Sequence, residues 1–94
     1  MKDSLAHIAS TMNYAGFSTA TLARDTPKHA PRSGWFRRGV GGVYVFVTTC
    51  VGRGDGLLAE LYDANGKCLN RQRCDDALRA AETAEHMLRS RLAY

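Results

Sequence analysis

Residues 43–73 read VYVFVTTCVGRGDGLLAELYDANGKCLNRQR, and this stretch decides the fold. It opens with a run of β-branched and aromatic residues, 43–51, which glycines bound on both sides, a pattern typical of a strand. The odd-numbered positions of the run are mostly valines and the even-numbered ones include Tyr44 and Phe46, so apolar side chains occupy both faces. We therefore expect 43–51 to be the central strand of a sheet, covered at least in part on each side.

Two further strands are predicted within the same stretch. Residues 57–62 return after a glycine-rich turn, and residues 63–66 (DANG) form a tight hairpin turn whose last two residues can adopt positive φ. The third strand, 67–73, carries Arg71 and Arg73 on one face and has no fully apolar face. Charged side chains of this kind are typical of an edge strand, where they discourage pairing with another sheet.

A helix is predicted on each side of these strands. Apolar residues at helical spacing predict a first helix over 4–15, which Asp3 or Ser4 can cap and Gly16 can end. The last helix, 75–92, shows one apolar stripe. Its members are Ala77, Leu78, Ala81, Ala84, Leu88 and Leu92.

The threonine-rich residues 17–23 are either an edge strand or an extended run into the next segment. The predicted fold class is α+β: a two-layer sandwich of one helix, a three-stranded antiparallel meander and a C-terminal helix. The sheet gains a fourth strand if 17–23 joins it. With 94 residues, the chain is expected to form a single domain, 1–94.

The net charge of the chain is concentrated in residues 24–38, RDTPKHAPRSGWFRR. This segment holds five of the thirteen basic residues and one of the nine acidic residues, which accounts for the whole net charge of +4. It also contains both prolines and the single tryptophan. We therefore interpret 24–38 as a stiff basic loop between the first helix and the central strand, and as a contact surface.

The candidate partner-binding residues combine this loop with the edge strand. Guanidinium groups form paired hydrogen bonds with phosphates or carboxylates, a lysine adds a point charge, and tryptophan stacks on a base or fills a partner's pocket. The candidates are Lys28, Arg32, Trp35, Arg37, Arg38, Arg71 and Arg73. The alternative is that Trp35 and Phe36 belong to the core as the start of a strand, in which case Arg37 and Arg38 still flank the sheet.

No catalytic residue, metal ligand or cofactor is predicted. The histidines His7, His29 and His86 share no motif, and the three cysteines lack the short paired spacing of a zinc site. An odd number of cysteines also argues against a disulfide framework. The N-terminus has no apolar run typical of a secretory signal, and no segment approaches the roughly 20 apolar residues needed to span a bilayer. We expect a cytoplasmic protein, either a monomer or a homodimer.

The order of elements resembles that of the double-stranded RNA-binding domain. At the start of the last helix, however, where that family has a basic run, this chain has Cys74, Asp75 and Asp76. Residues 69–82 (LNRQRCDDALRAAE) are similar to small antitoxins that pair a short meander with a helix.

The strand, DANG turn, strand and alanine-rich helix resemble the small single-domain anti-CRISPR proteins of phages. That resemblance implies a non-enzymatic, stoichiometric inhibitor that docks on a nucleic-acid-guided protein complex. Because the net charge is positive, we expect docking of the basic loop onto an acidic protein surface or a ribonucleoprotein. The alternative is direct binding of RNA or DNA, and Asp75 and Asp76 weigh against it by repelling phosphate.

Overall fold

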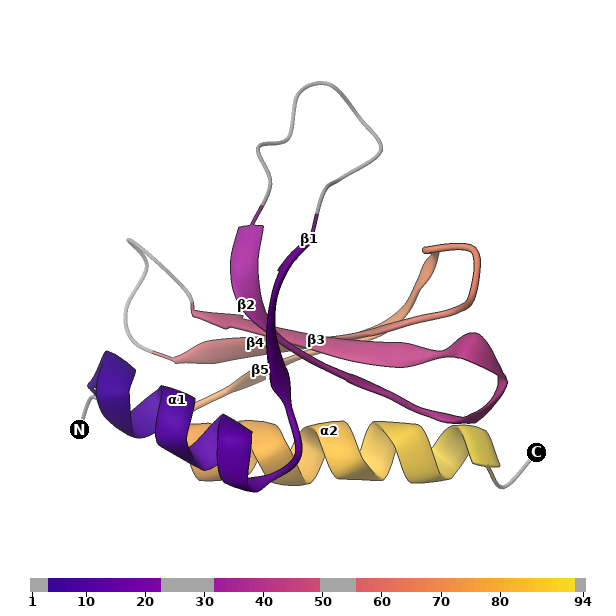
Figure 1. Cartoon of the computed structure of the whole chain (residues 1–94). Coiled ribbons are helices and arrows are strands. Elements are labelled where there is room, and N and C mark those ends of the chain that lie inside the picture. The colour runs from indigo at the N-terminus through magenta and orange to yellow at the C-terminus, as the bar shows by residue number, and fades with distance from the viewer. Residues whose placement is uncertain (1–3, 23–31, 50–55, 93–94) are drawn as a thin grey trace.

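The computed structural model describes residues 4–22, 32–49 and 56–92, which form an α+β sandwich of one sheet and two helices. Five strands follow one another in an antiparallel sheet of order β1-β2-β3-β4-β5: β1 (Ser18–Leu22), β2 (Arg32–Arg38), β3 (Tyr44–Thr49), β4 (Leu57–Tyr62) and β5 (Cys68–Cys74). The helices α1 (Leu5–Tyr14) and α2 (Ala77–Leu92) lie on the same face of the sheet (Figure 1). We call the opposite face the open face, because no described helix covers it.

The α+β fold class is confirmed, and the number of strands is larger than predicted. β3 is central, as expected, and the threonine-rich segment joins the sheet as β1. The second half of the expected basic loop is not a loop but the strand β2, whose Phe36 lies opposite Phe46 of β3. Alternation explains this correction: Trp35 faces the helices, whereas Phe36 faces the open side, as in any strand with two apolar faces.

Local signals set the ends of α1. The Ser4 hydroxyl accepts a hydrogen bond from the His7 N–H at 3.1 Å, so Ser4 is the N-cap. At the other end Gly16 has a φ of 90°, and the Phe17 N–H donates to the Met12 carbonyl at 2.9 Å. This left-handed glycine turns the chain out of the helix and into β1.

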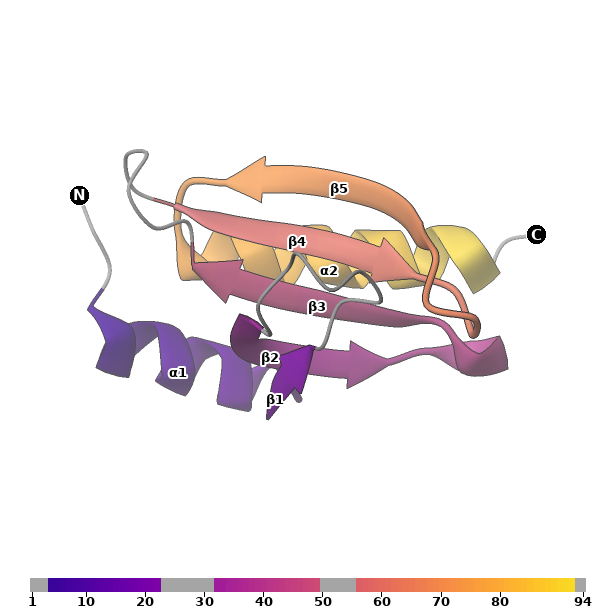
Figure 2. The ribbon, with the colours of Figure 1, turned by 90° about the horizontal axis from the view of Figure 1, so that it is seen from above.

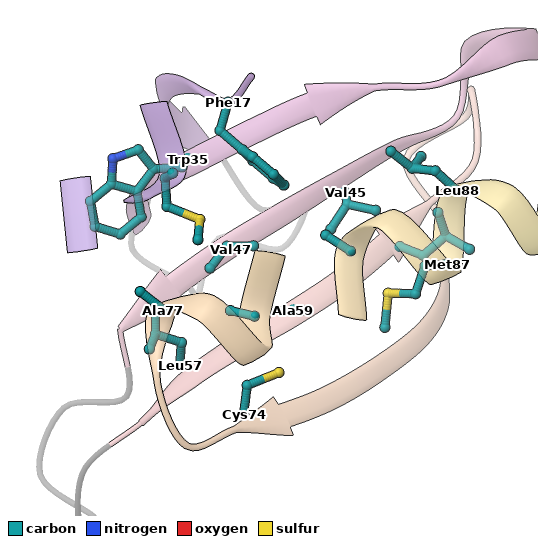
Figure 3. Close-up of a cluster of buried hydrophobic side chains, with 14 of the residues drawn as sticks. Phe17, Trp35, Val45, Val47, Leu57, Ala59, Cys74, Ala77, Met87 and Leu88 are labelled. Carbon is teal, nitrogen blue, oxygen red and sulfur yellow. The ribbon is translucent and has the colours of Figure 1, made fainter. Parts of the chain in front are cut away.

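The core lies between the helices and the sheet (Figure 3). The odd-numbered valines of β3 meet Ile8 and Met12 of α1 and the inner face of α2 in one cluster. In Figure 2 α2 lies under β3, β4 and β5, with α1 beside it. The buried residues of α2 are Ala77, Ala80, Ala84, Met87 and Leu88.

The stripe predicted for α2 therefore needs one correction. Leu78 was expected to face the sheet, and it is 64% exposed. The face of α2 that packs against the sheet is rotated about the helix axis relative to the predicted stripe, so that Ala80 and Met87 are buried. Small alanines opposite the sheet let the helix and the strands approach closely.

At Gly34, β2 passes close to the backbone of β3. A Cβ atom on Gly34 would lie 2.2 Å from the backbone oxygen of Val47 and 3.0 Å from Cζ of Phe46. No side chain fits there without a shift of the backbone, so the glycine permits this close approach of β2 and β3.

We expect Gly34→Ala to lower the free energy of unfolding by about 1–3 kcal/mol, the usual cost of overpacking. Urea denaturation followed by circular dichroism would measure it. Ser33→Ala is the matched control, because Ser33 is the neighbouring residue with an exposed side chain, and its effect should stay within about 0.5 kcal/mol. Equal free energies of unfolding for Gly34→Ala and Ser33→Ala would show that β2 and β3 accommodate the added Cβ atom without cost.

Candidate nucleic-acid interface

Four aromatic rings gather on the open face. Phe36 lies directly opposite Phe46, and Tyr44 lies directly opposite Tyr62, so the rings form two neighbouring rows across β2, β3 and β4. The rings of Tyr44 and Tyr62 stack with centroids 5.2 Å apart and an angle of 14° between their planes. We call Phe36, Tyr44, Phe46 and Tyr62 the aromatic strip.

The rings of the aromatic strip differ in their access to a ligand. Phe46 and Tyr62 are 1% and 4% exposed and form its floor, whereas Phe36 and Tyr44 are half-buried. A ligand on the open face would therefore meet the rings of Phe36 and Tyr44 first.

Arginines flank the aromatic strip on both sides. On β2, exposed Arg38 lies opposite Tyr44, and its guanidinium carbon is 5.7 Å from the centroid of the Phe36 ring. This distance is in the range of a cation–π interaction. On β5, exposed Arg71 and Arg73 lie opposite Glu60 and Leu58 of β4. Three strand spacings, about 14 Å, separate the two sides.

Glu60 is the only buried charged residue among the described ones, and it is 0% exposed. Arg71 Nε donates to Oε2 of Glu60 at 3.0 Å, and Arg71 Nη2 forms an ion pair with the same oxygen at 2.9 Å. This ion pair neutralises the carboxylate that lies within the row of Phe36 and Phe46. Arg71 is thus partly engaged by the fold, although 52% of its side chain remains exposed.

The structure divides the predicted contact residues between the two faces. Trp35 is 9% exposed and belongs to the core cluster, so the core alternative for this residue is confirmed. Arg37 also faces the helices: its Nη1 lies 3.2 Å from Oε1 of Glu85 on α2 and 3.5 Å from the carbonyl oxygen of Ala15. Arg37 therefore ties β2 to both helices and does not join Arg38 on the open face.

The other predicted contact residues are placed as follows. Arg38, Arg71 and Arg73 lie on the open face, on opposite sides of the aromatic strip. The backbone of Arg32 pairs with Leu22 at the start of β2. Lys28 lies outside the described residues, as does Cys50.

Sequence reasoning missed the aromatic strip as a site. Tyr44 and Phe46 were assigned to the even-numbered face of the central strand, but Phe36 and Tyr62 were not connected with them. The alternation of residues 34–38 was the available signal, since it predicts that Phe36 and Arg38 share a face if this segment is a strand.

The acidic start of α2 lies at the opposite end of the sheet from Arg38. Asp76 Oδ1 accepts a hydrogen bond from the Arg79 N–H at 2.8 Å, as an N-terminal helix cap does. Asp75 and Asp76 follow Cys74, which pairs with Leu57, the first residue of β4. The row of Tyr44 and Tyr62 lies at the other end of this strand, because Tyr62 is its last residue.

The described residues hold no cluster of three or more histidine, cysteine or acidic side chains placed to bind a metal ion. Among the described helices none combines the length and the apolar character that crossing a membrane requires. Comparisons with protein families, with curated proteins and with solved structures find no match to this chain.

Proposed function

We propose that this chain is a small non-enzymatic protein that binds single-stranded nucleic acid, alone or within a ribonucleoprotein, through the open face of its sheet. The observation that carries the proposal is the aromatic strip with arginines on both sides. Half-buried rings offer stacking surfaces to unpaired bases, and exposed guanidinium groups bind phosphates. A sheet that presents aromatic rings is one of the recurring ways in which proteins bind single strands.

The two aspartates weigh little against a phosphate bound near Arg38. Five residue steps along β4, about 17 Å, separate Leu57 from the row of Tyr44 and Tyr62. This distance exceeds the Debye length of about 8 Å at physiological ionic strength, so the repulsion of a phosphate near Arg38 is largely screened. Asp76 is also engaged at the N-terminus of α2.

A stoichiometric inhibitor that docks on a nucleic-acid-guided protein complex is the second candidate. One observation favours it: β5 is an edge strand that pairs only with β4 among the described strands. An edge of this kind accepts an added strand from a protein partner. Arg71 and Arg73 would favour a partner with an acidic surface there.

The test of the proposal is a salt titration of binding. We expect a fluorescein-labelled single-stranded oligonucleotide of about ten nucleotides to bind the wild-type chain with an affinity that falls linearly on a log–log plot against salt. Replacing Arg38 and Arg73 together with alanine should reduce the slope by about 1.4, since each phosphate contact to a single strand contributes about 0.7. Fluorescence anisotropy would measure both quantities.

The matched control replaces Arg79 and Arg89, which are exposed on α2, with alanine. It removes the same charge from the helical layer and should leave the slope unchanged. An equal loss in both double variants would indicate a general effect of net charge. Absence of oligonucleotide binding, together with a nuclease-resistant complex with a CRISPR effector, would favour the inhibitor.

A further inference from the structure

A hollow opens on the open face beside the aromatic strip. Its volume is about 340 Å³, near the lower end of the range of about 300–1,000 Å³ that is usual for small-molecule sites. β1, β2 and β3 form its base, and residues of the two turns at the same end of the sheet complete it. Its lining includes Ala20, Phe36, Arg38, Tyr44, Phe46 and Ala64.

The lining combines flat apolar surfaces with one cation. The buried Phe46 has Phe36 opposite it on β2 and Tyr44 two residues along β3, so three rings line the hollow. Ala20 on β1 and Ala64 in the β4–β5 turn are short, which leaves the space between the rings open. Arg38 is exposed, and none of the described residues that line the hollow is acidic.

These properties suit one class of ligand better than others. A phosphate alone would make no contact with the faces of the phenylalanine rings, and an aliphatic chain would make no use of the charge of Arg38. A nucleobase has a flat face for stacking on the rings, and its own backbone carries the phosphate that Arg38 can bind. The volume has room for one base.

We propose that this hollow holds one unstacked base of a bound single strand, with Phe36 and Tyr44 as its stacking surfaces and Arg38 on the adjacent phosphate. This inference rests on the proposed function, because it specifies how the same face reads a strand. Under this inference, insertion of a base into the hollow, and not charge alone, supplies a large part of the affinity for the single strand.

An abasic strand tests the inference directly. We expect the wild-type chain to bind an oligo(U) of about ten nucleotides about 10- to 100-fold more tightly than the same strand without bases, because stacking contributes about 1–3 kcal/mol per base. Ala20→Leu, which fills the hollow, should lower the affinity for oligo(U) by a similar factor and leave the affinity for the abasic strand unchanged. Ala64→Leu, in the exposed turn, provides a second filling variant.

Ala6→Leu is the matched control, since Ala6 is exposed on α1 in the other layer and its replacement should change neither affinity. Equal binding of oligo(U) and the abasic strand, or undiminished binding by both filling variants, would overturn the inference while leaving the proposed function intact. Binding of neither strand by the wild-type chain would overturn both. Photocrosslinking with 5-iodouridine should also label Phe36 or Tyr44. Crosslinks confined to α2 would contradict binding of a base in the hollow.

Discussion

Replacing Trp35 with alanine is expected to lower the free energy of unfolding by about 3–5 kcal/mol, the range for large aromatic side chains in a core. Trp35 is 9% exposed and packs in the cluster that joins the sheet to the helices. A domain of this size is stabilised by only about 5–15 kcal/mol in total, so the loss is a large fraction of its stability. Chemical denaturation monitored by circular dichroism would measure the change.

Phe36→Ala is the control for this prediction, because Phe36 is the next residue and points to the other face. It is half-buried, so we expect a smaller loss of stability together with weaker binding of oligonucleotides. If Trp35→Ala does not fold, Trp35→Phe keeps most of the apolar surface and should lose about 1–2 kcal/mol. If the Trp35→Ala variant kept native stability and lost oligonucleotide binding, Trp35 would be a contact residue and not a core residue.

The ion pair of Glu60 and Arg71 predicts that Arg71→Met lowers the free energy of unfolding more than Glu60→Met does. Arg71→Met removes the hydrogen bond and the ion pair that Arg71 forms with a carboxylate that is 0% exposed, and we expect it to cost about 3 kcal/mol. Glu60→Met leaves behind a guanidinium that is 52% exposed and can turn to water. Because the remaining charge is hydrated, this second change should cost less, about 1 kcal/mol or below.

The measurement is the unfolding free energy of both single variants and of the double variant. The double variant should be more stable than Arg71→Met, since it removes the buried carboxylate together with its partner. Arg89→Met is a suitable control, because Arg89 pairs with the partly exposed Glu85 at 3.8 Å and should change stability by less than about 0.5 kcal/mol. Equal costs for the first two variants would mean that burial of Glu60 does not determine the energy of the pair.

Most of the layer structure could be predicted from local patterns. The valines of residues 43–51 alternate with aromatic residues, the DANG turn joins two strands, and the alanine-rich segment has a helical period. Gly66 of that turn has the expected positive φ, of 85°, whereas Asn65 does not. Each of these signals lies within a few residues of the element that it specifies.

β2 escaped prediction because of a partner far away in the sequence. Arg37 shares the helix-facing side of the strand with Trp35, which breaks the expected alternation of apolar and polar faces. Its charge is met by Glu85, 48 residues further along the chain, and no local pattern reveals that ion pair. The segment therefore looked like a basic loop.

The candidate site depends on register in the same way. Arg38, Arg71 and Arg73 could be proposed from charge alone, but their common face and the rings between them follow from the pairing of four strands. The pairing of Phe36 with Phe46 and of Tyr44 with Tyr62 brings those rings together, and neither pairing is visible in one strand by itself.

The meander has a consequence for folding during synthesis. Every strand pairs with its neighbours in the chain, so each hairpin can form as soon as its second strand has left the ribosome, and the contacts that form are local. α2, however, is made after all five strands, and it covers the apolar side of β3 and β4. Until it docks, the nascent sheet exposes Val45, Val47 and Ala59 to solvent, and this interval is when a chaperone would be needed most.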